Sequence, residues 1–323
     1  MATRLLSFSG SEASFSPSRL GVAAGRVLFV LFAAYAIYTT RTASRFDSGI
    51  LISLGVAVGM YVMFGRRGGL RPMIIYIIAT GTFTQLRLLA DETGMPVQVG
   101  YVISMERGIF GTIPSSWLQA QLHETGQLSP VNVFAIAVYL TYFASFPIGA
   151  LVMWIRFRGF FSSFATAMVL ASYIGLLTCI VLPTAPPWLA SSQGSTPEIH
   201  RLVQEATSTG AYGGGASVAG VNQVAAMPSL HMALTVIAMF TVWRLTPNRL
   251  WRAAGVLYAG SMAFALVFLG EHYVVDEIFG VLTAVIAWRC ATRLWSADGE
   301  FLLNLRMPGR LRAVKQPLPA SVS

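Results

Sequence analysis

Charged residues are scarce in this sequence. Of its 323 residues only 11% are charged, while 55% are hydrophobic. A soluble globular domain carries about 25% charged residues, so this chain lacks the polar surface that a water-soluble fold of its size needs. The missing polar surface must face lipid instead, and the sequence predicts an all-α integral membrane protein.

Lysine is almost absent, because Lys315 is the only lysine among 22 basic residues. The net charge of +9 raises the question of nucleic-acid binding. The arginines, however, are scattered between apolar runs and form no basic stripe. They flank the predicted membrane spans, so we expect no nucleic-acid partner.

Cysteine is also rare, with only Cys179 and Cys290, and both lie inside apolar runs. Single cysteines in such runs usually pack as small hydrophobic side chains. The sequence therefore predicts neither a disulfide framework nor a cysteine metal site. The first 19 residues are polar and rich in serine, and the apolar run after them lacks a small-residue cleavage site. We interpret that run as a retained span rather than a removed signal peptide.

Eight apolar runs approach the length of about 20 residues that a helix needs to cross a bilayer. They cover residues 20–38, 50–64, 73–89, 131–154, 161–182, 228–243, 253–269 and 273–288. The second run is the shortest and requires tilt or a locally thinner bilayer. We predict a cytoplasmic segment with two extra transmembrane helices over 1–71, a six-helix core over 72–295 and a basic cytoplasmic tail over 296–323.

The distribution of basic residues predicts the orientation of these spans. With the N-terminus inside and each run crossing once, 17 basic residues lie on the inner side and 5 on the outer side. Inner loops of membrane proteins carry the excess of Lys and Arg. We therefore predict a multi-pass protein of the cell membrane with both termini in the cytoplasm, and a tail that lies on the anionic inner leaflet.

Two predicted outer loops, 90–130 and 183–227, are unusually long, and long loops in compact proteins are often functional. The first contains Arg107, Phe110 and Trp117, a mixture typical of a helix at the membrane interface. The second contains Trp188 near its start and a glycine-rich stretch over 210–220. These two loops are the parts of the chain that could cover an outer site as a lid.

The first candidate site residue is His231, in the run Met-Pro-Ser-Leu-His where a loop enters an apolar run. Pro228 is expected in the first turn of the helix, where its missing N–H costs nothing. The free N–H groups of that turn could bind an anion, with Ser229 and His231 facing it. The alternative is a helix cap beside an interfacial histidine.

The second candidate is His272, which is followed four residues later by Asp276. Residues four apart share one face of a helix, and a carboxylate on one ring nitrogen fixes the tautomer and raises the basicity of the other. This arrangement suits an activated nucleophile. Acidic residues at the head of a membrane span are costly and usually functional, although a structural polar pair is the alternative.

The predicted topology places both histidines on the same side of the membrane. His231 begins the sixth span at its outer end, and His272 begins the eighth span at its outer end. The two imidazoles can therefore meet across one pocket at the outer surface. The remaining histidines, His123 and His200, lie in outer loops, and we interpret them as solvated loop residues.

Two elements, Pro-Ser-x-His (Pro228 to His231) and His-x-x-x-Asp (His272 to Asp276), resemble those of the type 2 phosphatidic acid phosphatase superfamily. Their histidines lie 41 positions apart. Three segments resemble more closely the inositol phosphorylceramide synthase branch of this superfamily. They are Pro186-Pro187-Trp188, Ala226 to His231, and His272-Tyr273 to Asp276. The resemblance covers about residues 73–288 and implies a helical core of six membrane spans.

This resemblance implies roles for single residues. His272 would be the nucleophile that forms a phosphohistidine, Asp276 would orient it, and His231 would be the general acid. It also points to Ser229, Pro187, Trp188 and Tyr273 as residues beside the substrate. No metal or other cofactor is implied, and the sequence suggests no Asp, Glu and His cluster of metal-ligand type on the outer side.

The sequence departs from the family pattern at the expected phosphate clamp. The first motif, KxxxxxxRP, is absent, and Ala265 and Leu266 replace the Ser-Arg pair of the third motif. A phosphoryl transition state still needs positive charge or N–H donors. Arg107, Arg87 and Arg201 are the candidates on the outer side, and we rank Arg107 first because it lies in the interfacial segment.

We therefore expect an enzyme that cleaves a phosphoester of a membrane lipid through a phosphohistidine. An alcohol acceptor, such as an inositol, would make it a phosphotransferase, and water would make it a lipid phosphatase acting on phosphatidic acid or a polyprenyl phosphate. A transporter on the same fold is the non-enzymatic alternative, although transporters usually keep polar groups near the bilayer midplane. The lipid, the acceptor and the oligomeric state stay open.

Overall fold

The computed structural model describes residues 71–89, 95–123, 129–208 and 224–295. These ranges form ten helices, and their pairing outside helices is limited to two isolated parallel bridges that join Gln98, Thr184 and Ala225. The long helices are α3 (Arg71–Leu89), α6 (Pro130–Arg156), α7 (Arg158–Val181), α10 (Leu230–Leu245), α11 (Arg249–Phe268) and α12 (Val274–Leu294). The short helices are α4 (Gly100–Phe110), α5 (Pro114–Leu122), α8 (Pro187–Ser192) and α9 (Leu202–Ser208).

Six of the eight predicted spans coincide with the six long helices, so the helical fold is confirmed. Four predicted segments lie outside the described residues: the apolar runs over 20–38 and 50–64, the glycine-rich stretch over 210–220 and the basic tail. Of the described helices, α6, α7 and α11 are long and apolar enough to cross a membrane. Shorter apolar segments occur in α3, over 72–84, and in α10.

The outer surface of the bundle is strongly apolar. Large hydrophobic side chains point away from the protein along several of the long helices, among them Ile75, Ile155, Leu177, Leu257 and Ile278. In water such a surface would be unfavourable, because each of these side chains would keep its apolar area exposed. The arrangement fits a bundle whose sides face lipid.

Small residues allow the central helices to approach closely. Helix α7 packs against α3, α10 and α12, and their shared core contains Ala167, Ala171, Ala233 and Ala284, all fully buried. Small side chains are typical of helix contacts in membranes. At Gly280 a Cβ atom would lie 2.5 Å from the carbonyl oxygen of Ser229. Glycine is therefore required where the start of α10 crosses α12.

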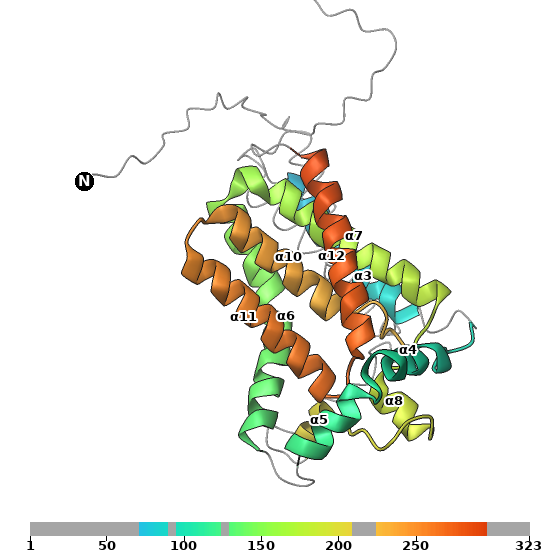
Figure 1. Ribbon diagram of the computed structural model, residues 1–323. Helices are drawn as coiled ribbons and strands as arrows, with labels where there is room; N and C mark the ends of the chain where they lie inside the picture. Colours follow the sequence, from blue (N-terminus) through green and yellow to red (C-terminus); the bar gives the residue numbers. More distant parts are fainter. Residues whose placement is uncertain (1–70, 90–94, 124–128, 209–223, 296–323) are drawn as a thin grey trace, which may run out of the picture.

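The short helices gather at one end of the bundle. Figure 1 shows α4, α5 and α8 beside the first residues of α12. The predicted interfacial helix is present as two helices, α4 and α5, separated at Gly111, whose φ of +72° favours glycine. Phe110 and Trp117 are exposed on them, as expected for side chains that dip into a membrane surface. This end of the bundle carries the candidate site.

Candidate active site

Helix α10 begins at the site with a side-chain cap. Ser229 is its N-cap residue, and the Ser229 hydroxyl accepts a hydrogen bond from the backbone N–H of Met232 at 3.2 Å. Pro228 precedes the cap, so its expected place in the first turn is wrong by two positions. Ser229 is fully buried. Its capping role fixes where the helix starts and places His231 in the first turn.

Helix α12 begins beside it and is joined to α10 by a backbone contact. The backbone N–H of Ser229 donates to the carbonyl oxygen of Asp276 at 3.0 Å. The Asp276 side chain turns back, and its Oδ2 accepts the N–H of Tyr273 at 2.9 Å. A carboxylate at this position is favoured by the free N–H groups and by the helix dipole. The first turns of both helices are thereby held in one fixed arrangement.

The two predicted histidines meet at this junction. Nδ1 of His231 lies 3.2 Å from Nε2 of His272. On the other side of the His272 ring, Nδ1 lies 3.6 Å from Oδ2 of Asp276. The structure thus brings together the three residues that the sequence selected, and it places them in the order His231, His272, Asp276.

The geometry restricts the proton positions. If His272 directs its Nδ1–H towards the Asp276 carboxylate, its Nε2 carries the lone pair and must accept. Nδ1 of His231 is then the donor in the contact between the rings. A buried carboxylate that orients an imidazole in this way leaves the opposite nitrogen nucleophilic.

Aromatic side chains from α6 surround His231. The ring centroids of Tyr142, Tyr139 and Phe143 lie 4.1, 5.2 and 6.1 Å from that of the histidine. Rings of this kind attract a cation on a neighbouring group. The sequence reasoning missed this cage, although the spacing of residues 139, 142 and 143 by three and four already places them on one face of a helix.

Two recesses meet at the histidine pair. One is largely apolar and includes Phe83, Leu176 and Leu230. The other is polar and includes Trp188, Arg201 and Glu271. Arg87, His231 and His272 line both recesses. The histidines therefore lie where an apolar space and a polar space join.

The arginines at the pocket differ from the first choice made from the sequence. Arg107 is exposed on α4 and lines neither recess, so the structure does not support its first rank. Arg87 and Arg201 line the pocket instead. Arg201 donates from Nε to Glu271 at 2.8 Å, and its guanidinium lies 4.5 Å from the centre of the Trp188 ring. These contacts hold the guanidinium beside the histidines.

The other predicted substrate residues have different positions. Trp188 lines the polar recess, and its indole N–H has no hydrogen-bond partner among the described residues. Pro187, Ser229 and Tyr273 are buried, and none of the three lines a recess. These three shape the backbone around the pocket. Of the expected lid residues, Phe110 and Trp117 also lie outside the pocket lining.

Glu106 is a residue that the sequence reasoning missed. It is fully buried, and its Oε1 accepts the N–H of Val275 at 2.9 Å, so it caps α12 from α4. Burial above all, and the nearby Asp276 carboxylate in addition, raise the pKa of the Glu106 carboxyl from 4.5 to about 7, although the hydrogen bond from Val275 lowers it. The available signal was an acidic residue within an otherwise apolar and basic interfacial segment.

The remaining two histidines are not the solvated residues that the sequence suggested. The His123 side chain is only 5% exposed, and that of His200 is 27% exposed. Both contact Glu205, and the three groups lie close enough to hold a metal ion. The expectation of no Asp, Glu and His cluster of metal-ligand type around these loops is therefore wrong.

Comparison with known proteins identifies the family of this chain. The chain is 24% identical over 237 residues to the phosphoinositol dihydroceramide synthase of Bacteroides thetaiotaomicron, covering 68% of this chain and 74% of that relative. It is 23% identical over 283 residues to the catalytic subunit of inositol phosphorylceramide synthase of Schizosaccharomyces pombe, covering 82% of this chain and 62% of that one. No solved structure matches significantly. The family model of the PAP2 superfamily matches residues 101–290, and the chain therefore belongs to this superfamily of all-α membrane proteins.

Proposed function

We propose that this protein is a membrane lipid phosphotransferase that works through a phosphohistidine on His272. The observation that carries the proposal is the relay from His231 Nδ1 to His272 Nε2, 3.2 Å apart, with Asp276 behind the second ring at 3.6 Å. This is the arrangement of a general acid, a nucleophile and an orienting carboxylate. Its position in an arginine-lined pocket supports a phosphate ester as the substrate.

In the first step, Nε2 of His272 attacks the phosphorus atom and forms a P–N bond. The P–O bond to the leaving group breaks in line with it. His231, as an imidazolium, gives its Nδ1 proton to the leaving oxygen instead of to His272. The negative charge of the bound phosphate favours this protonated form, and the aromatic rings around His231 add cation–π attraction.

In the second step, the acceptor hydroxyl attacks the phosphohistidine. His231, now neutral, removes the proton of that hydroxyl, a new P–O bond forms and the P–N bond to His272 breaks. Both histidines return to their starting forms, so the protons balance over the cycle. Proton transfer of this kind contributes typically about 10²- to 10⁴-fold to the rate.

Positive charge for the transition state comes from the protein in this proposal. Arg87 and Arg201 line the pocket and replace the clamp of the missing family motifs. The Trp188 N–H is a further donor. Among the described residues, His231, His272 and Asp276 are not part of a three-ligand metal cluster. We propose that the chemical step itself uses no metal at the histidine pair, so that added Mg²⁺ does not change the rate of phosphoenzyme formation.

The two recesses suggest how a lipid and a polar group share the site. The apolar recess with Phe83 and Leu176 suits the lipid part of a substrate, and the polar recess with Arg201 and Glu271 suits a hydroxyl-rich headgroup. By their names, one relative is a phosphoinositol dihydroceramide synthase and the other is the catalytic subunit of an inositol phosphorylceramide synthase. We propose by analogy that this chain transfers a phospho-headgroup, such as inositol phosphate, to a lipid alcohol.

Hydrolysis of a lipid phosphate is the second candidate, since water can attack the same phosphohistidine. A transferase must exclude water and hold its acceptor, and such positioning is worth several kcal/mol. Trp188 lines the polar recess with its ring against the Arg201 guanidinium, and an apolar wall of this kind favours transfer. A transporter is the non-enzymatic alternative.

The proposal includes an orientation in the membrane. The site faces the outer side, and both termini lie in the cytoplasm.

Purified protein in mixed micelles tests the proposal with phospholipids labelled in the headgroup phosphate. We expect label to pass to an added alcohol, with ceramide and diacylglycerol as the first acceptors to compare. His272→Asn should abolish release and transfer. His231→Asn should slow both steps, and less so for substrates whose leaving group needs no proton. Full turnover in either variant, or release of the labelled headgroup phosphate into water alone with every acceptor, would contradict the transferase.

A further inference from the structure

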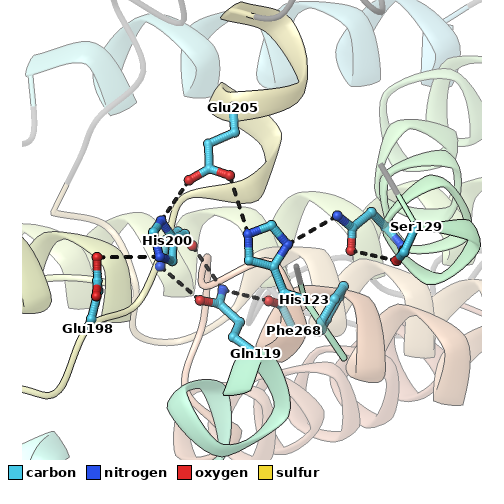
Figure 2. Close-up of polar contacts among 8 residues, drawn as sticks. Gln119, His123, Ser129, Glu198, His200, Glu205 and Phe268 are labelled. Carbon is cyan, nitrogen blue, oxygen red and sulfur yellow. Dashed lines mark hydrogen bonds and ion pairs between the residues drawn. The ribbon is translucent and has the colours of Figure 1, made fainter. Parts of the chain in front are cut away.

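A second polar cluster lies next to the pocket and takes no part in the proposed reaction. His123 ends α5, His200 lies in the loop before α9, and Glu205 lies within α9. Figure 2 shows the Glu205 carboxylate between the two imidazoles, with one oxygen directed at each ring. Two parts of the chain, the end of α5 and residues 200–205, thus direct ligand-type atoms at one point.

The distances in this cluster suit a shared cation. Nδ1 of His200 lies 2.7 Å from Oε1 of Glu205, and Nε2 of His123 lies 3.5 Å from Oε2. One ligand atom from each residue lies within 4.8 Å of the other two. The buried Nε2 of His123 has no hydrogen-bond partner among the described residues. A buried polar atom without a partner is costly, and a metal ion would satisfy it.

Surrounding groups hold these ligands in place. Nδ1 of His123 contacts the side-chain amide of Asn132 at 3.2 Å. The backbone of His200 is clamped by Gln119, whose Oε1 accepts the His200 N–H at 2.8 Å and whose Nε2 donates to the His200 carbonyl at 2.9 Å. Contacts to the non-ligating atoms of metal-binding histidines commonly fix ring orientation.

We propose that His123, His200 and Glu205 bind one divalent transition metal ion, with zinc as the best match. Two imidazoles and one carboxylate are a known zinc donor set, with bonds of about 2.0 to 2.2 Å and a water as the fourth ligand. In a tetrahedral site with such bonds, ligand atoms lie about 3.3 Å apart. The three ligand atoms lie within 4.8 Å of one another, so their separations must change by up to about 1.5 Å to reach this spacing.

Binding also sets the proton positions. Nε2 of His123 must offer a lone pair to the metal, so its Nδ1 carries the hydrogen and must donate. The Asn132 amide can turn to present its oxygen to that hydrogen, because the Ser129 hydroxyl beside it can both donate and accept. The His200 nitrogen that binds must likewise be free of hydrogen. Metal binding therefore weakens as the pH falls.

The site lies where it can hold the pocket in shape. His200 directly precedes Arg201, which lines the polar recess. The His200 carbonyl also approaches Gly270, where a Cβ atom would lie only 2.8 Å from that oxygen and φ is +75°. Gln119 extends the same connection to the carbonyl of Phe268 at 2.8 Å. The metal would thus tie α5 and α9 to the loop that leads into His272.

Metal content measures this proposal without reference to any turnover, so its failure and that of the proposed function are separable. Full-length protein without an affinity tag is equilibrated with zinc sulfate, dialysed against metal-free buffer and analysed by mass spectrometry of the metal. We expect about one zinc ion per chain. Replacement by Co²⁺ should give visible absorption bands typical of tetrahedral nitrogen and oxygen ligands.

Two glutamate variants provide a matched comparison. Glu205→Gln should lose the bound zinc, whereas Glu198→Gln should retain it, because Glu198 is 83% exposed and contacts His200 at 3.4 Å on the ring's other nitrogen. Added zinc should raise the melting temperature of the wild type and of Glu198→Gln only. A wild type without bound zinc, or a Glu205→Gln variant that binds it equally, would overturn the site and leave a hydrogen-bonded cluster.

Discussion

The clearest perturbation of stability is Glu106→Gln. The Glu106 carboxyl is fully buried, caps α12 through the N–H of Val275 and faces Asp276, Glu277 and Tyr273. Burial raises its pKa from 4.5 to about 7. Glutamine has the shape of the protonated acid and can accept the same N–H, but it cannot ionise.

The raised pKa of Glu106 determines how the stability of the folded protein changes with pH. Below pH 4.5 the carboxyl is protonated in both the folded and the unfolded chain, so its ionisation costs nothing. As the pH rises from 4.5 to about 7, the unfolded chain loses this proton first and the folded state is destabilised relative to it. Above pH 7 the carboxyl is ionised in both states, and the loss of stability reaches its full value. The pKa shift corresponds to a loss of about 3 kcal/mol of unfolding free energy.

Reversible unfolding titrations in mixed micelles at pH 5 and pH 8 measure this effect. We expect Glu106→Gln to resemble the wild type at pH 5 and to exceed its stability by roughly 2 to 3 kcal/mol at pH 8. Glu198→Gln, at an exposed position, is the control and should follow the wild type at both pH values. Equal pH dependence in wild type and Glu106→Gln would refute the reasoning.

Three further predictions concern the pocket and the topology. Arg201→Gln should lower kcat/KM by about 10²-fold or more, as expected for loss of a group that stabilises transition-state charge, while exposed Arg107→Gln should stay near wild type; equal effects would remove Arg201 from the site. Trp188→Ala should raise the ratio of hydrolysis to transfer and leave phosphoenzyme formation within about tenfold of wild type; an unchanged ratio would remove Trp188 from acceptor positioning. Single cysteines at Ser192 and Asn248 should react oppositely with an impermeant thiol reagent in intact cells, and reaction at position 248 alone would invert the topology.

The sequence was sufficient to select the two histidines of the candidate site. The Pro228 to His231 element and the His272 to Asp276 element each precede an apolar run, and counting the spans puts both at the same side. That reasoning needs only helix length and loop charge, which are local properties of the chain. The observed contact between His231 and His272 follows from it directly.

Other parts of the site depend on contacts between distant residues. Arg87, Arg107 and Arg201 look alike in the sequence, and only the packing of α4 away from the pocket separates Arg107 from the others. Glu106 caps a helix that begins 168 residues later, and no local pattern indicates that contact. The His123 side chain is buried because residues of α6 and α9, Asn132 and Glu205, pack against it at the end of α5.

A phosphoenzyme on His272 tests the central claim most directly. The purified protein is mixed with a phospholipid labelled in its headgroup phosphate, without acceptor, quenched at alkaline pH and digested for peptide mapping. The account predicts an acid-labile, base-stable label on the peptide that contains His272, absent from His272→Asn. Continued turnover of the wild type with no labelled protein, or with the label on another residue, would contradict it.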